Sequence, residues 1–257
     1  MNFKNKSIVI CGGSDGIGKS CAELFAAKGG STTLIARNKE KLTSVINDLD
    51  TSKSQVHKYI CADFNNPEEL DIKINKELSS KTDILINNSG GPRGGLLEKS
   101  TLAEFRVSFD RLLLSNQIVT RHAIKGMKKQ KYGRIINIIS TSVKQVIPGL
   151  GVSNTIRGAV AQWGKTLALE LGEYGITVNN ILPGYTKTDR LSELSTAKAK
   201  DLNITKEQIE VMWADSTALK RLADPKEIAN TILFLASEGS SYITGHNLAV
   251  DGGRFKT

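Results

Sequence analysis

The sequence has few residues of the types that bind metals or form disulfides. Three cysteines and three histidines are spread over 257 residues. Cys11, Cys21 and Cys61 have neither C-x-x-C spacing nor the spacing of a zinc site. The histidines are isolated in sequence, so no metal site is expected. We expect the cysteines to be small buried side chains in a reducing cytoplasm, where disulfides are rare.

Long apolar segments are also missing. No apolar run approaches the roughly 20 residues of a membrane-spanning helix, so we expect no membrane partner. The first apolar run follows Lys4 and Lys6 and is too short for a signal peptide. The net charge of +9 comes from lysines scattered along the chain, with no nucleic-acid-binding motif. We therefore expect a cytoplasmic protein with a solvated basic surface and no nucleic-acid partner.

Nothing in the sequence divides the chain into parts. There is no low-complexity tract, internal repeat or linker, and 39% of the residues are apolar, enough for a sizeable core. A chain of this length is often one α/β unit. Strand and helix patterns alternate: strands at Val56–Cys61, 83–91 and Arg134–Ile139, and a helix at Pro67–Leu78. The alternation predicts one α/β domain over residues 1–257, with a parallel sheet covered by helices on both faces.

A glycine-rich turn near the start is the strongest single signal. The strand pattern Ile8–Cys11 runs into this turn, and a helical pattern follows at once. Glycine takes unusual backbone angles, and its missing Cβ lets a pyrophosphate approach the helix N-terminus. The alternative is an ordinary glycine-rich βα turn, because short glycine patterns are common. The turn residues are Gly12, Gly13, Ser14, Asp15, Gly16, Ile17 and Gly18.

The second strand, Thr32–Ala36, ends at the position that selects the cofactor in dinucleotide-binding folds. A carboxylate there would bind the ribose of NAD, whereas an arginine pairs with the 2′-phosphate of NADP. Arg37 occupies this position, so NADP is favoured, with NAD as the alternative. Asp15 in the turn weakens that preference if it lies near the same phosphate. A surface arginine without a role is the remaining interpretation.

Several motifs in order resemble one family. The glycine turn, Asn87–Gly90 after the fourth strand, Pro183–Gly184 after the sixth, Tyr242–Gly245 and Asp251–Gly253 are similar to the short-chain dehydrogenase/reductase family. The 3-oxoacyl carrier-protein reductase branch is the nearest match, and the resemblance covers essentially the whole chain. It implies a Rossmann-type, doubly wound parallel sheet. It also implies cofactor contacts from Asp63 and Phe64 at adenine, Asn87, Ser89 and Gly90 at ribose, and Pro183, Gly184, Thr186 and Thr188 at nicotinamide.

The family's catalytic residues are only partly present. The resemblance places Ser140 at the position of the carbonyl-polarising serine. It places Ser153 where the proton-donating tyrosine belongs and Arg157 at the position of the lysine, which also binds ribose. The asparagine position falls on Leu112, with Asn116 one turn away. A serine hydroxyl is a much weaker acid than a phenol, and the arginine proton is effectively fixed. Standard catalysis is therefore in doubt.

Two other side chains are candidate proton donors. Lys144 follows Ser140 in a loop, where partial burial beside Arg157 would lower its pKa. Tyr185 follows Pro183–Gly184 and offers a phenol from the other side. The alternatives are a solvated loop lysine and a packed tyrosine.

Two functions are consistent with these residues. The first is an NADP-dependent oxidoreductase that interconverts a carbonyl and an alcohol, on a small carbonyl compound or an acyl thioester. The second is a redox-inactive dinucleotide-binding protein that serves as a sensor or scaffold. The apolar helical stretch Ala159–Gly172 implies, by resemblance, a homo-oligomer such as a homotetramer. The resemblance also suggests an acyl carrier protein as partner, with a docking patch at Lys125, Lys128, Lys129 and Lys131.

Overall fold

The first strand shows how the core is built. Ile8 and Ile10 pack into the core on one face of the sheet, and Val9 and Cys11 pack into the core on the other. Successive side chains of a strand point to opposite faces, so a strand covered on both sides is apolar at every position. The computed structural model describes residues 1–255.

The strands form one parallel sheet in the order β3-β2-β1-β4-β5-β6-β7. The direction in which strands are added reverses between β1 and β4, which leaves a crevice at their carboxyl ends. The strands are β1 Ser7–Cys11, β2 Ser31–Ala36, β3 Lys58–Cys61, β4 Ile84–Asn87, β5 Gly133–Ile138, β6 Ile176–Pro183 and β7 Asn247–Val250. The helices are α1 Gly16–Ala27, α2 Lys39–Asp48, α3 Pro67–Glu77, α4 Leu102–Phe109, α5 Ser115–Gln130, α6 Gly151–Leu171, α7 Asp189–Leu202, α8 Lys206–Asp215 and α9 Pro225–Ala236.

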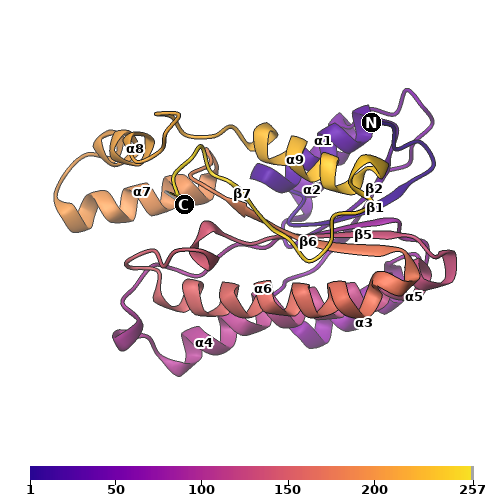
Figure 1. Cartoon of the computed structure of the whole chain (residues 1–257), viewed down its shortest axis with the longest axis horizontal. Helices are drawn as coiled ribbons and strands as arrows, with labels where there is room; N and C mark the ends of the chain where they lie inside the picture. Colours follow the sequence, from indigo (N-terminus) through magenta and orange to yellow (C-terminus); the bar gives the residue numbers. More distant parts are fainter. Residues whose placement is uncertain (256–257) are drawn as a thin grey trace.

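Helices cover both faces of the sheet (Figure 1). Helices α1, α2 and α9 pack on one face, and α3, α5 and α6 pack on the other, with α4 beside α6. Helices α7 and α8 pack on each other beyond the carboxyl ends of the strands. The predicted Rossmann-type, doubly wound fold is confirmed.

The predicted element boundaries agree with the structure to within one or two residues at most ends. The third strand is shorter than predicted: it begins at Lys58, because Val56 is exposed and its N–H donates to the Ser31 side chain instead. The predicted helical stretch Ala159–Gly172 is the second half of a longer helix, α6. Its first half contains Ser153 and Arg157.

A row of four asparagines crosses the sheet interior. Asn87, Asn137, Asn180 and Asn247 are paired in register on β4 to β7. Asn137 Nδ2 donates to Asn180 Oδ1 over 2.8 Å, and Asn87 Nδ2 donates to Asn137 Oδ1 over 2.9 Å. Gly164 of α6 lies directly over this row, since a Cβ there would be 2.6 Å from Asn180 Oδ1. Because Gly164 has no side chain, α6 packs closely on β6, over amides that donate to one another along the row.

The environment of the cysteines differs from the expectation at one position. Cys11 and Cys21 are buried, and burial raises the pKa of Cys11 to about 12, which makes it a poor nucleophile. Cys61 is only half-buried, because it ends β3 at the open edge of the sheet. Among residues 1–255, no helix is long and apolar enough to cross a membrane.

Candidate active site

The glycine-rich turn brings helix α1 directly over the end of β1. Gly12 and Gly16 have positive φ angles of 61° and 50°. A Cβ on Gly18 would lie 2.1 Å from the carbonyl oxygen of Gly12, so no other residue fits there without moving the turn. Asp15 caps the helix, its Oδ1 accepting from the N–H of Gly16 over 2.7 Å. The result is a bare backbone surface at a helix N-terminus, which suits a phosphate.

Two other loops meet this turn. The side chain of Asn88, after β4, donates to the Gly12 carbonyl over 3.4 Å. Thr188, after β6, lies against Gly16, where a Cβ would be 3.0 Å from its Cγ2. Thr188 also caps α7 by accepting from the N–H of Leu191. The loops after β1, β4 and β6 therefore form one continuous surface at the carboxyl edge of the sheet.

A lysine that the sequence analysis did not single out neutralises Asp15. Lys41 Nζ lies 2.6 Å from Asp15 and 3.6 Å from Asp189 at the start of α7. Burial opposes ionisation of Asp15, but the hydrogen bonds from Lys41 and from the Gly16 N–H outweigh it and lower the pKa of Asp15. The aspartate is therefore already paired, and its expected repulsion of a nearby phosphate is reduced.

Cationic side chains gather near the ends of β2 and β3. Arg37 is exposed at the end of β2, and Arg111 is half-buried between α4 and α5. Burial lowers the pKa of Arg111, and the positive charge of Arg37 lowers it further. Arg111 donates to the Asn65 side chain over 2.7 Å, which places it beside the predicted adenine contacts Asp63 and Phe64. Sequence alone gave no signal for Arg111, because the contact joins segments 46 residues apart.

The side chain of Asn87, expected at the ribose, faces the core. Its side chain is 1% exposed and donates to Thr120 and Asn137 within the core. It cannot turn toward a ligand without breaking the asparagine row. Ser89 and Gly90 remain at the site, with Ser89 Oγ donating to the Arg111 carbonyl over 3.2 Å.

The structure brings Ser140, Ser153 and Arg157 together. Arg157 Nε donates to Ser153 Oγ over 3.3 Å, and Nη1 donates to the carbonyl of Ile139, the residue before Ser140. Ser140 Oγ accepts from the Ser142 N–H over 3.1 Å. Removal from water lowers the pKa of Arg157 to about 10, and the charge of Arg190 adds to the effect. Arg157 nevertheless stays protonated at neutral pH.

The two candidate proton donors differ in position. Lys144 is exposed, so the partial burial expected for it is wrong: it ends a short turn, Thr141–Val143, that points it away from the packed core. Tyr185 is half-buried and stacked on Trp213 of α8, with ring centroids 4.8 Å apart. Burial raises the pKa of Tyr185, against the opposing charge of Arg254.

Leu112, the residue expected at the family's asparagine position, lies in the core. Leu112 is 3% exposed and packs with Val152 and Ile156 of α6. It lies in a π-helical turn, Asp110–Leu114, between α4 and α5. Asn116 is buried in the first turn of α5. The described residues contain no group of three histidine, cysteine or acidic side chains that would hold a metal ion.

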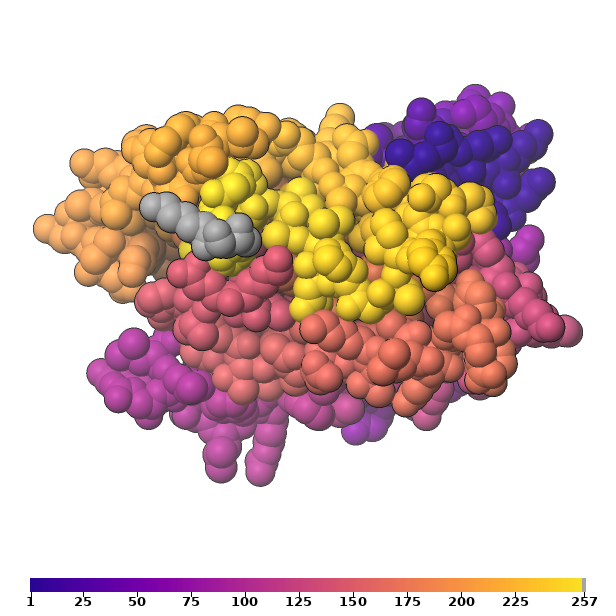
Figure 2. Space-filling model, viewed as in Figure 1, coloured from indigo at the N-terminus to yellow at the C-terminus, as the bar shows by residue number. Residues whose placement is uncertain are grey.

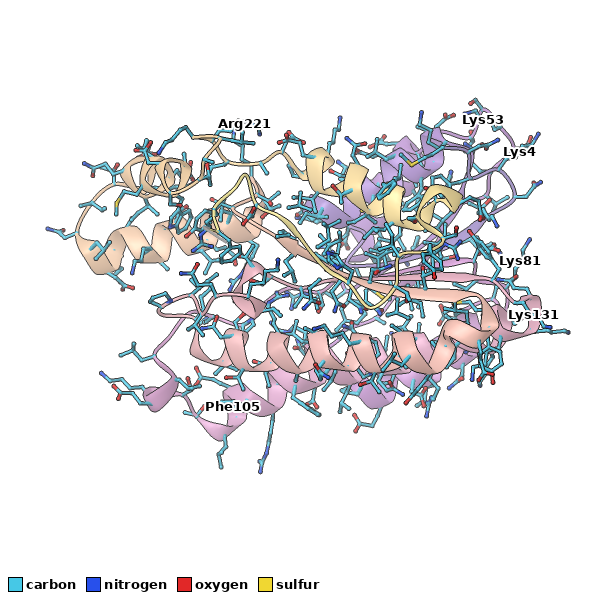
Figure 3. The ribbon with its side chains drawn as sticks, in the orientation of Figure 1. Lys4, Lys53, Lys81, Phe105, Lys131 and Arg221 are labelled. Atoms are coloured by element: carbon cyan, nitrogen blue, oxygen red, sulfur yellow. The ribbon has the colours of Figure 1, made fainter. Side chains whose placement is uncertain are left out.

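The lysines proposed as a docking patch lie elsewhere. Figure 3 shows Lys131 at the end of the molecule opposite α7 and α8, together with Lys4, Lys53 and Lys81. Lys131 follows α5 and precedes β5, so it lies at the amino ends of the strands. The patch and the site are on opposite edges of the sheet.

The fold and this carboxyl-edge surface define a nucleotide-binding α/β protein of the doubly wound class. A family model described as enoyl-(acyl carrier protein) reductase matches residues 12–254. The chain is 33% identical over 251 residues to a 3-oxoacyl-[acyl-carrier-protein] reductase of Chlamydia muridarum, covering 97% of each chain. It therefore belongs to the short-chain dehydrogenase/reductase family.

Two further similar proteins have NADPH in their names or descriptions. An "NADPH-dependent reductase BacG" of Bacillus subtilis is 27% identical over 258 residues, covering 99% of this chain and all of the relative. The solved structure of L-sorbose reductase from Gluconobacter frateurii, complexed with NADPH and L-sorbose, is similar with a TM-score of 0.91 and 29% identity. That match covers all of this chain and 99% of the other.

We expect Gly18→Ala to destabilise the protein, because the added Cβ would meet the Gly12 carbonyl at 2.1 Å. Overpacking of this kind costs about 1–3 kcal/mol. Gly90→Ala is the matched control, since nothing lies within 4 Å of a Cβ there. Urea unfolding of both variants measures the difference, and equal midpoints would contradict the close contact.

Proposed function

We propose that the chain binds NADPH and reduces a carbonyl compound to an alcohol. One observation carries the proposal: three arginines that no ion pair of residues 1–255 includes lie at the carboxyl edge of the sheet, and two of them, Arg111 and Arg157, approach Gly91 after β4. Within the described residues, no ion pair includes Arg37, Arg111 or Arg157. The charge of Arg37 lowers the pKa of Arg111, and a polyanionic ligand relieves such repulsion between cations. The relatives named for NADPH support the same cofactor.

The residues at this edge fit a dinucleotide phosphate. In this proposal the Gly12–Gly18 turn holds the pyrophosphate, and Arg37 with Lys41 receives the 2′-phosphate. Asp63 and Phe64 flank adenine. The ribose and nicotinamide are held by Ser89, Gly90, Arg157, Pro183, Gly184 and Thr188. The Thr186 side chain is 5% exposed and donates to the Gly184 carbonyl, so it stabilises this loop more than it contacts a ligand.

Bound NADPH would supply the hydride, and the chain's own residues would polarise the carbonyl oxygen and donate a proton to it. Ser140 is half-buried at the end of β5, where its hydroxyl would polarise that oxygen. Arg157 provides a fixed positive charge one residue from Ser140, through its hydrogen bond to Ile139. A preorganised charge of this kind stabilises a developing alkoxide. Ser153 accepts a hydrogen bond from Arg157, which the Ile139 carbonyl also holds in place.

Tyr185 is the first candidate for the proton donor, because Lys144 is exposed. The phenol of Tyr185 is protonated at neutral pH like any tyrosine, and burial, which raises its pKa, makes it a weaker acid than a free phenol. A protonated phenol beside the developing alkoxide can complete the reduction. The substrates in the relatives' names, an oxoacyl group on a carrier protein and a ketose, both carry such a carbonyl.

We expect NADPH to bind more tightly than NADH by about 1–3 kcal/mol, since charge-assisted hydrogen bonds to the 2′-phosphate contribute that much. Calorimetry measures both affinities. Arg37→Ala should remove most of the difference. Lys41→Ala should remove part of it and should also leave Asp15 unpaired beside the phosphate.

Lys39→Ala is the matched control, because Lys39 is exposed at the start of α2 and takes part in none of the ion pairs of residues 1–255. An NADH preference that survives Arg37→Ala and Lys41→Ala would overturn the assignment.

Turnover tests the catalytic roles. We expect Ser140→Ala to lower kcat by about 100-fold, as for loss of a donor aimed at developing charge. Tyr185→Phe should lower kcat by about 10²–10⁴-fold while keeping its stack on Trp213. Lys144→Ala and Ser153→Ala should change kcat little. NADPH oxidation is screened against ketones, aldehydes and oxoacyl thioesters.

Two results would contradict this scheme. A collapse of activity in Ser153→Ala, with Tyr185→Phe unaffected, would move the proton transfer to Ser153 or to a water bound there. Tight NADPH binding without turnover on any carbonyl would favour the alternative function, a redox-inactive sensor or scaffold.

We also infer that the chain forms a symmetric oligomer through α4 and α6. Leu169 of α6 is 87% exposed and Leu102 of α4 is 74% exposed, and Phe105 and Phe109 of α4 line a shallow groove with Ile156. Figure 3 labels Phe105 on α4, where it is partly buried against the cluster that contains Ile156. Light scattering should give a dimer or tetramer, and Leu169→Glu should lower the mass. A monomer at micromolar concentration would refute the inference.

A further inference from the structure

The last residues of the described chain return to the site. After β7, Gly252 and Gly253 adopt positive φ angles of 65° and 71°, which turn the chain sharply. The Asp251 carboxylate accepts from the N–H groups of Gly253 and Phe255, over 3.1 and 3.2 Å. This turn fixes the direction in which Arg254 leaves the backbone.

The turn packs against the loop after β6. A Cβ on Gly184 would lie 2.7 Å from the Cα of Asp251, so the two segments are in direct contact. Figure 2 shows the C-terminal segment, in yellow, between the orange helices α7 and α8 and the rose atoms of the chain after β5. The segment thus bridges the two sides of the substrate end of the site.

Arg254 makes one contact with each side. Its guanidinium carbon lies 4.4 Å from the centre of the Tyr185 ring, and Tyr185 is itself stacked on Trp213 at an interplanar angle of 9°. On the other side, its Nη1 lies 3.4 Å from Thr141 Oγ1. Thr141 is the residue after Ser140, the proposed carbonyl-polarising group. The guanidinium is therefore held by an aromatic ring and a hydroxyl, close to the position of the reaction.

The charge of Arg254 has no acidic partner among residues 1–255, since none of their ion pairs includes it. Its neighbours Tyr185 and Thr141 are neutral. The side chain is half-buried, so water screens it less than a surface arginine. A planar guanidinium held in one orientation is suited to a carboxylate, which it binds through two parallel hydrogen bonds.

We propose that Arg254 binds the carboxylate of the substrate, so that the protein reduces small oxo acids in preference to acyl thioesters. This rests on the proposed function. The carbonyl carbon gains a hydride from NADPH and the carbonyl oxygen gains a proton, which yields a hydroxy acid and NADP+. An acyl thioester on a carrier protein has no carboxylate beside its carbonyl. Its nearest anion is the phosphate of the carrier arm, which the whole pantetheine chain separates from the carbonyl. Arg254 contacts Thr141, the residue next to Ser140, so it lies too close to the carbonyl to reach that phosphate.

Matched substrate pairs test the proposal. Each 2-, 3- and 4-oxo acid of four to six carbons is compared with its primary amide, and a 3-oxoacyl thioester of N-acetylcysteamine is the third arm. We expect the wild-type chain to favour one acid over its amide by at least 10-fold in kcat/KM. Arg254→Ala should lower kcat/KM for that acid by about 10–100-fold, mainly through KM, and leave the amide within about threefold. Arg254→Lys should recover part of the loss.

Arg121→Ala is the control, because Arg121 is an exposed arginine of α5 paired with Asp71, outside the site. Equal use of acid and amide by the wild-type chain would overturn the proposal, as would a preference for the thioester. An equal loss on acid and amide in Arg254→Ala would show a structural role only.

A binding measurement separates this proposal from the proposed function. Calorimetry with the corresponding hydroxy acid and its amide is done on the chain with and without NADP+. Carboxylate binding that Arg254→Ala abolishes would support the anion site even if no carbonyl compound were reduced. Reduction of neutral ketones, with no carboxylate binding, would support the reductase and overturn the anion site.

Discussion

The close approach of Gly18 to the carbonyl of Gly12 is the contact on which the site depends. It sets the start of α1 directly over the end of β1, and the side chain of Asn88 closes the same turn from β4. Thr188 reaches Gly16 from β6. Three loops from distant parts of the sequence therefore share one surface, with the backbone N–H groups of a helix start at its centre. Without this contact the start of α1 would move away from β1, and the three loops would no longer meet.

The charges around this surface follow from its geometry. Arg157 has a pKa lowered to about 10 and no acidic partner in the described chain, so its charge is destabilising until an anion arrives. The acidic side chain in the glycine turn, Asp15, is already neutralised by its ion pair with Lys41. Such a site gives up some stability of the free protein in return for affinity toward anions. The same reasoning applies to the substrate end, where Arg254 faces the loop after Ser140.

Local sequence patterns predicted the fold well, because strands, helices and the glycine turn are each marked by residues close together in sequence. Apolar runs identify strands covered on both faces, and the glycines of the turn are adjacent in sequence. The site was harder to predict, because its chemistry depends on tertiary contacts. Lys41 meets Asp15 across 26 residues, and Arg254 meets Thr141 across 113. Lys144 was expected to be partly buried from its loop position alone, yet the turn exposes it. Asn87 matches the residue type of the family motif, but a hydrogen bond to Asn137, its partner on β5, keeps the Asn87 side chain in the core.

We propose that the carboxyl edge supports hydride transfer with Ser153 and Arg157 at the positions where the family resemblance led us to expect a tyrosine and a lysine. The most direct measurement uses NADPH carrying deuterium at the transferable C4 position, with the best carbonyl substrate. The account predicts one deuterium on the carbinol carbon of the product. A product without deuterium, or unchanged substrate with NADPH tightly bound, would contradict it.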